Sequence, residues 1–336
     1  MDDVSRPGPS GTTGPRTGLT RPGRRTAAAG VIVLAVVAGA SGCGAAAVGS
    51  SGLTTPTYVT EQMAYTATMK ESSADASVTT SLSLSVGGRK LHETATESGP
   101  ASWAADEAQF QTTMNVDGLE TVTIRQLVEG NHDYSRVSSS VHLPSSLTSG
   151  IPGLSGWEET TWSGTSSSDP SQALATFLLA PSGLGHVVDP ASLLALLETQ
   201  ASSIQNLGSA VLDGVSATHY RALVPLSALG SLSPAELRQV ERVFRSNSLS
   251  FDYWIDANGL LRQLRLSISV DPARVPDDTP SSPGQINLKI TSPISMSTTL
   301  RLSNYGTPVN LVLPSPSQIT SQVSCTVSSN GFNCDS

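Results

Sequence analysis

The sequence predicts an α+β fold in which helices are laid across one face of an antiparallel sheet. Three observations carry this prediction: stretches of alternating apolar and polar residues, turn dipeptides between them, and a central group of helix signals. Strands followed by helices and again by strands favour such a fold over a parallel one. Clean alternation also implies one covered apolar face and one polar face rich in Ser and Thr.

Residues 1–42 are predicted to be a lipoprotein signal peptide. Five arginines precede an apolar run from Ala27 to Ala40, which is the order of a charged n-region and an apolar h-region. The run is shorter than the roughly 20 residues that a membrane-spanning helix needs. It ends at Ala40-Ser41-Gly42-Cys43, which resembles the lipobox of bacterial lipoproteins. We therefore expect Cys43 to carry acyl chains such as palmitate.

Acylation of Cys43 would anchor the protein to the extracytoplasmic face of the cell membrane. Residues 43–57 then read as a lipidated cysteine and a flexible tether with a reach of roughly 20 Å. Two points stay open. If the leader is instead a plain signal peptide cleaved nearby, Cys43 is not a lipidation site. In addition, Ala40 stands where the lipobox usually has Leu. Arg24-Arg25 raises twin-arginine export, although the apolar pair of that motif is missing, so the export route is undecided.

Alternation predicts the strands. Asp117-Gly118 and Asn258-Gly259 predict tight hairpin turns, and Ser138–Ser155 and Pro272–Gly284 read as loops. The residues that share a face within each predicted strand are Val78, Leu82, Leu84 and Val86; Phe110, Thr112, Met114 and Val116; Val122, Ile124 and Val128; Leu249, Phe251, Tyr253 and Ile255; Leu264, Leu266, Ile268 and Val270; Ile286, Leu288 and Ile290; Ile294, Met296, Leu300 and Leu302.

Helix signals concentrate in the middle of the chain. A capping residue precedes proline at Asp169-Pro170, Asp189-Pro190 and Ser233-Pro234, and an apolar stripe follows each pair. Proline is favoured at the first helical position because its missing N–H would be unpaired there in any case. A weaker pattern predicts a further helix from about Thr57 to Ser73.

The chain is acidic, with a formal net charge of −8. Because residues 1–42 hold five arginines and two aspartates, the remainder is more negative by three charges. No basic cluster is evident, which argues against a nucleic-acid partner and against electrostatic docking on a membrane. We expect the lipid anchor to hold the protein at the membrane, and we expect a monomer.

The cysteines and histidines indicate structure rather than catalysis. Cys325 and Cys334 flank a short polar loop, and in an exported protein such a pair favours a disulfide. The five histidines lack metal-ligand spacing, and the sequence contains no nucleophile elbow and no phosphate-binding glycine loop. His132-Asp133 would be half of a catalytic triad, but it lies beside a predicted turn. The sequence therefore predicts no metal, no cofactor and no enzymatic activity.

Several short motifs, taken in order, resemble the LolA-like lipoproteins of actinobacteria, of the LppX and LprG type. They are LVEGNHDYSRV (Leu127–Val137), Trp157 after a Gly/Pro loop, VLDGVSATHY (Val211–Tyr220), YWIDANGLLRQLRL (Tyr253–Leu266) and YGTPVNLVLPSP (Tyr305–Pro316). The resemblance implies a curved antiparallel half-barrel over residues 58–316, with helices covering a concave apolar face around a cavity for acyl chains. Residues 317–336 are expected to form a C-terminal tail with the disulfide.

The expected function is non-catalytic binding of lipid or lipoglycan acyl chains by a membrane-anchored envelope lipoprotein. Such a cavity needs an aliphatic lining without buried charge. Alternatively, the same side chains form an ordinary packed core, and the fold serves protein interaction or sensing with no bound lipid. The volume of an apolar cavity separates these alternatives. The candidate lining residues are Phe110, Met114, Ile124, Phe251, Tyr253, Leu264, Leu266 and Met296.

Overall fold

The structure is a computed structural model, and only part of the chain is described in it. The leader with Cys43, the helix expected after Pro170 and the strand expected at Ile286–Ile290 lie outside the described residues. The described residues are 55–86, 89–116, 119–139, 154, 156–163, 190–228, 237–238, 241–242, 244, 246–270, 293–328 and 331–335.

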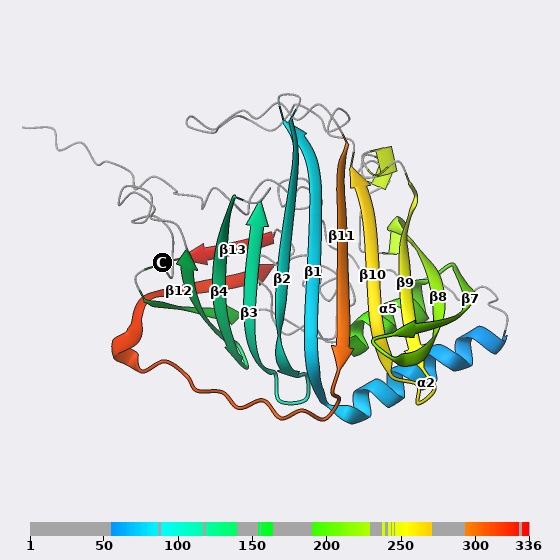
Figure 1. The fold of residues 1–336 in the computed structure, drawn as a ribbon, viewed down its shortest axis with the longest axis horizontal. Helices are drawn as coiled ribbons and strands as arrows, with labels where there is room; N and C mark the ends of the chain where they lie inside the picture. Colours follow the sequence, from blue (N-terminus) through cyan, green and yellow to red (C-terminus); the bar gives the residue numbers. More distant parts are fainter. Residues whose placement is uncertain are drawn as a thin grey trace, which may run out of the picture.

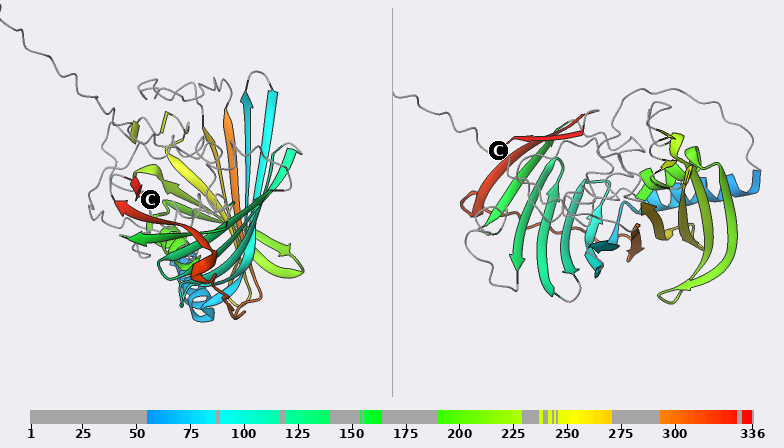
Figure 2. Two further views of the ribbon diagram at one scale, coloured as in Figure 1. Left: turned by 90° about the vertical axis from the view of Figure 1, so that its left-hand side faces the viewer. Right: turned by 90° about the horizontal axis from the view of Figure 1, so that it is seen from above.

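These residues form one large, open and curved sheet of 13 strands with two α-helices against it (Figures 1 and 2). The described strand pairs are antiparallel except for β6 and β12, which are parallel. The elements are α2 (Thr55–Glu71), β1 (Ser73–Val86), β2 (Arg89–Ser102), β3 (Glu107–Val116), β4 (Leu119–Glu129), β5 (His132–Ser139), β6 (Trp157–Ser163), α5 (Pro190–Gln200), β7 (Ser203–Leu212), β8 (Val215–Pro225), η3 (Leu226–Ala228), β9 (Ser248–Asp256), β10 (Leu261–Val270), β11 (Ile294–Ser303), η5 (Pro316–Gln318), β12 (Ile319–Ser328) and β13 (Gly331–Asp335).

Two meanders make up most of the sheet. β1 to β6 run in sequence order on one side, β7 to β11 on the other, and the two series meet where β1 pairs with β11. Figure 1 shows this pair at the centre of the sheet. The segment from residue 317 onward, which the sequence analysis sets apart as a tail, supplies β12 and β13 to the same sheet, beside β6.

The predicted hairpins are confirmed wherever the structure describes them. β3 pairs with β4 and β9 with β10, in the register that alternation implies. In the β9–β10 turn, Gly259 has φ +82°, a conformation that glycine adopts without steric cost. A Cβ on Gly259 would also lie 3.3 Å from the Cβ of Ala67 in α2. This glycine therefore lets the turn approach the helix closely.

Both α-helices begin near a predicted position. α5 starts at Pro190 as the capping pattern indicates, and α2 corresponds to the weak helical pattern, although it also includes residues 55–57 of the expected tether. The backbone N–H of Leu261 donates to Thr68 Oγ1 over 3.2 Å, which ties α2 to the start of β10. Within the described chain, neither helix has the length and apolarity needed to cross a bilayer.

The sheet has two faces of different character. We call the face that carries Val78, Phe251 and Leu266 the core face, because these side chains are buried in one cluster with residues of α2 and α5. The opposite face, which carries Thr79 and Arg265, is called the outer face. On β11 the buried positions alternate strictly from Ile294 to Leu302, as expected for a strand with one covered side.

Candidate functional site

The part of the core face that forms a cluster with α2 and α5 is densely apolar. Four leucines of α5 are at most 1% exposed, and they belong to one core cluster with Ala64 of α2 and the inward side chains of β8 to β11. α5 contacts both α2 and β8. Five of the eight candidate lining residues belong to this cluster: Phe110, Phe251, Tyr253, Leu264 and Leu266.

The core face becomes more open toward the end of the sheet that lies away from α2. Met296 belongs there to a second cluster with Leu82, and Leu84 and Ile268 pack against it while only partly buried. Met114 is half-buried near the same end of β3. We call Leu82, Leu84, Met114, Ile268 and Met296 the apolar rim. Ile124, the remaining candidate lining residue, is half-buried opposite Thr112, nearer the middle of the sheet.

Two buried carboxyl groups on the core face contradict the expectation of a lining without buried charge. Glu97 on β2 lies opposite Thr112 on β3, and the Thr112 hydroxyl donates to Glu97 Oε2 over 3.2 Å. Asp133 on β5 accepts a 2.7 Å hydrogen bond at Oδ2 from Gln126 of β4. Glu97 and Asp133 are 3% and 4% exposed. The core face over β2 to β5 is therefore mixed, with polar groups between apolar ones.

Burial changes the protonation of both groups. Desolvation raises the pKa of Glu97 to about 8, with a smaller contribution from the nearby Asp133 charge and an opposing one from the Thr112 hydrogen bond. Desolvation likewise raises the pKa of Asp133 to about 8, against the Gln126 hydrogen bond and with the Glu158 charge adding to it. Both carboxyls are consequently mostly neutral at pH 7. In the described part of the chain, Asp133 Oδ1 has no hydrogen-bond partner.

His132 and Asp133 do not form a catalytic pair. Neighbouring residues of a strand point to opposite faces, and His132 Nδ1 lies 2.9 Å from Glu159 Oε1 while Asp133 is held by Gln126. The described residues contain no group of three or more His, Cys, Asp or Glu side chains that could hold a metal ion.

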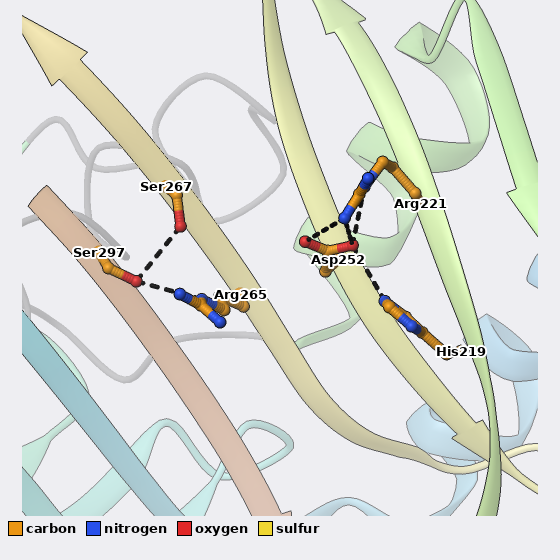
Figure 3. Close-up of polar contacts among 6 residues, drawn as sticks. All are labelled: His219, Arg221, Asp252, Arg265, Ser267 and Ser297. Carbon is orange, nitrogen blue, oxygen red and sulfur yellow. Dashed lines mark hydrogen bonds and ion pairs between the residues drawn. The ribbon is translucent and has the colours of Figure 1, made fainter. Parts of the chain in front are cut away.

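A polar cluster lies on the outer face of β8 to β11 (Figure 3). Asp252 accepts hydrogen bonds from Arg221 and from His219, the latter over 2.9 Å. The His219 ring stacks on Trp254 with 4.2 Å between ring centroids. On the next strands, Ser297 accepts a hydrogen bond from Arg265 Nε over 3.3 Å.

The outer face gathers arginines that sequence analysis missed. They are far apart along the chain, so no basic cluster is visible, but the strand register brings them to one exposed face. A search of the sequence for basic runs could not have found them, because the signal lies in the pairing of strands. The residues are Arg125, Arg136, Arg221, Arg265 and Arg301.

The two C-terminal cysteines lie directly opposite each other, Cys325 on β12 and Cys334 on β13. Cα atoms of directly opposed antiparallel residues are about 4.5–5.5 Å apart, within the range that a disulfide spans. Cys325 is buried.

No family model and no curated protein matches the chain. Among solved structures, lipoprotein LppX from Mycobacterium tuberculosis is 13% identical with a TM-score of 0.34, over 76% of this chain and 99% of LppX. LprF from Mycobacterium bovis is 12% identical with a TM-score of 0.34, over 76% of this chain and 97% of LprF. A DUF1329 family protein from Desulfovibrio piger is 10% identical with a TM-score of 0.27, over 76% of this chain and 96% of that one.

LppX is one of the lipoproteins that give their name to the type that the sequence motifs resemble.

Proposed function

We propose that this protein is an envelope lipoprotein, anchored through Cys43, that binds the acyl chains of a lipid or lipoglycan against the core face of its sheet. The observation that supports the proposal is the apolar rim. Leu84, Met114 and Ile268 are only partly buried and extend the apolar core cluster along the same face, where polar residues such as Glu93 also lie. In this proposal the core face is the concave face of a half-barrel that the helices cover.

Acyl-chain binding follows from the chemistry of the rim. Each methylene moved from water onto an apolar surface contributes about 0.8 kcal/mol, so a chain lying along the rim gains affinity without directional contacts. Neutral Glu97 and Asp133 would not repel an uncharged ester or hydroxyl group at the head of that chain. No group with a catalytic arrangement is needed for carriage.

The first test is native mass spectrometry of the full chain, purified gently from a lipoprotein-processing host, with organic extraction of anything bound. We expect a lipid adduct at near-unit stoichiometry, in addition to the covalent acyl chains on Cys43. An apo mass that takes up no added lipid would overturn the binding proposal. A chain that begins upstream of Cys43 without acylation would overturn the anchor alone.

A charge placed on the rim should abolish lipid binding. Met114→Lys would bury an ammonium group among the acyl chains, and we expect the lipid adduct to fall at least about tenfold. Thr113→Lys is the matched control, because it adds the same charge one residue earlier on the outer face of the same strand. Equal lipid loading of the two variants in native mass spectra would contradict binding at the rim.

We also propose that Cys325 and Cys334 form a cross-strand disulfide. Their direct opposition across β12 and β13 supports the pairing. In the chain-entropy model a loop this short stabilises by about 2–3 kcal/mol, so Cys334→Ser should lower the free energy of unfolding by that amount in urea titrations without reductant. Reducing agent should destabilise the wild type alone. Alkylation of both cysteines in the unreduced, denatured wild type would disprove the disulfide.

A further inference from the structure

Two rows of polar residues cross the outer face at right angles to the strands. In each row, every residue lies directly opposite the next one on the neighbouring strand. The arginine row is Arg301, Ser77, Ser98, Gln111, Arg125 and Arg136. The hydroxyl row is Arg265, Thr299, Thr79, Thr96, Thr113, Thr123 and Ser138.

The arginine row contains an unfavourable pair. Arg125 and Arg136 are exposed and directly opposite each other on β4 and β5, and like charges in that relation destabilise a sheet. No ion pair joins either of them to a carboxylate in the part of the chain that the structure describes. Arg221, by contrast, is neutralised by Asp252. A local conflict of this kind, left without compensation, is typical of a binding site.

The rows also have a defined length. Neighbouring strands lie about 4.8 Å apart, so the four steps from Arg301 to Arg125 cover roughly 19 Å. Between these two arginines the arginine row offers only Ser77, Ser98 and Gln111, which are hydroxyl and amide groups. The hydroxyl row runs parallel to it, two residues along each strand, at a distance of about 7 Å.

We propose that the outer face binds an anionic polysaccharide that lies across the strands along these two rows. Guanidinium groups bind carboxylate or phosphate oxygens in a two-pronged arrangement, and hydroxyl and amide side chains exchange hydrogen bonds with sugar hydroxyls. The rows carry positive charge on a chain that is acidic as a whole, so charge complementarity selects an anionic occupant. The absence of apolar residues from the described rows disfavours insertion into a lipid surface.

The test uses the full chain and alginate, a polyuronate, with dextran as the neutral polysaccharide. We expect binding to alginate that weakens as salt rises and no binding to dextran. Arg125→Gln with Arg136→Gln should weaken alginate binding at least about tenfold. This double variant removes the repulsion between the two arginines, so it should fold at least as well as the wild type.

The matched control loses the same two charges away from the rows. Lys70→Gln with Arg242→Gln changes two exposed residues, one at the end of α2 and one outside the sheet, and alginate binding should stay within about twofold of wild type. Arg125→Lys with Arg136→Lys keeps the positive charges but loses the planar guanidinium groups. This double variant should bind alginate more weakly than wild type.

Four outcomes would overturn the proposal. They are absence of alginate binding, unchanged binding by the Gln double variant, equal affinity for polyglutamate, and binding to phosphatidylglycerol vesicles that the Gln double variant loses. The third would assign the face to an acidic protein segment and the fourth to the membrane surface. The inference does not depend on lipid binding at the core face.

Discussion

Phe251→Ala is expected to lower the free energy of unfolding by about 3–5 kcal/mol, the usual cost of removing a large buried aromatic side chain. Phe251 is 0% exposed on β9, and its cross-strand neighbours are Ala222 on β8 and Leu266 on β10, which are also buried. Truncation would therefore leave a cavity beneath the helices that small neighbours cannot fill. Urea unfolding followed by tryptophan fluorescence measures the effect.

The control variant for Phe251→Ala lies on the same strand, β9. Ser250→Ala removes a hydroxyl group from the outer face of β9, next to Phe251, and should change the free energy of unfolding by less than about 0.5 kcal/mol. A loss below about 1 kcal/mol for Phe251→Ala in lipid-free protein would mean that the phenyl ring borders an existing void. The size of this loss therefore separates a packed core from a ligand cavity.

Stability should fall as pH rises from about 4 to 8, and Glu97→Gln with Asp133→Asn should remove much of that fall. Burial raises the pKa of Glu97 from 4.5 and that of Asp133 from 3.8, each to about 8. Within this window the folded chain holds protons that the unfolded chain releases, so a higher pH favours unfolding. The stabilisation from the two raised pKa values is fully present at pH values below the pKa values of the unfolded chain. It is lost once the pH exceeds the pKa values of the folded chain.

The amide variant keeps the shape and the two hydrogen bonds, because an amide oxygen can accept from Thr112 and from the Gln126 side chain. We expect it to be more stable than wild type at pH 8 and to have a flatter pH profile. Glu129→Gln, at an exposed carboxyl of β4, should leave the slope unchanged. An amide variant with the wild-type slope would show that neither carboxyl is held neutral by the fold.

Local features of the fold were predictable from the sequence. Alternation identified β1, β3, β4, β9, β10 and β11, because a strand with one covered face must place apolar residues at every second position. The Asn258-Gly259 turn and the start of α5 at Pro190 depend on the backbone preferences of a few neighbouring residues. Such local features can be predicted from residue types alone. The segment of β12 and β13 is predicted as a tail, although Val323, Cys325 and Val327 alternate with polar residues, because the pairing of β12 with β6 joins parts of the chain that are far apart in sequence.

Features that depend on long-range pairing were not predictable. Glu97 lies in a polar run, HETATESG, and resembles an ordinary surface charge until Val78 and Thr112 are found on either side of it. Arg125 and Arg136 are equally unremarkable until β4 and β5 align them. The candidate lining residues all lie on the core face, but alternation could not distinguish the buried core cluster from the partly buried rim.

The seam between β1 and β11 has a consequence for how the chain reaches its folded state. Asp75 pairs with Ser303. β1, at the centre of the sheet, therefore cannot complete its pairing until a strand more than two hundred residues later has been synthesised. Contacts of such sequence separation slow folding, because the intervening chain loses entropy before the pairing stabilises it. Until β11 arrives, the two meanders expose unpaired edges that are prone to aggregation. Folding should therefore be completed late, after most of the chain has been synthesised, and should depend on protection of those edges in the meantime.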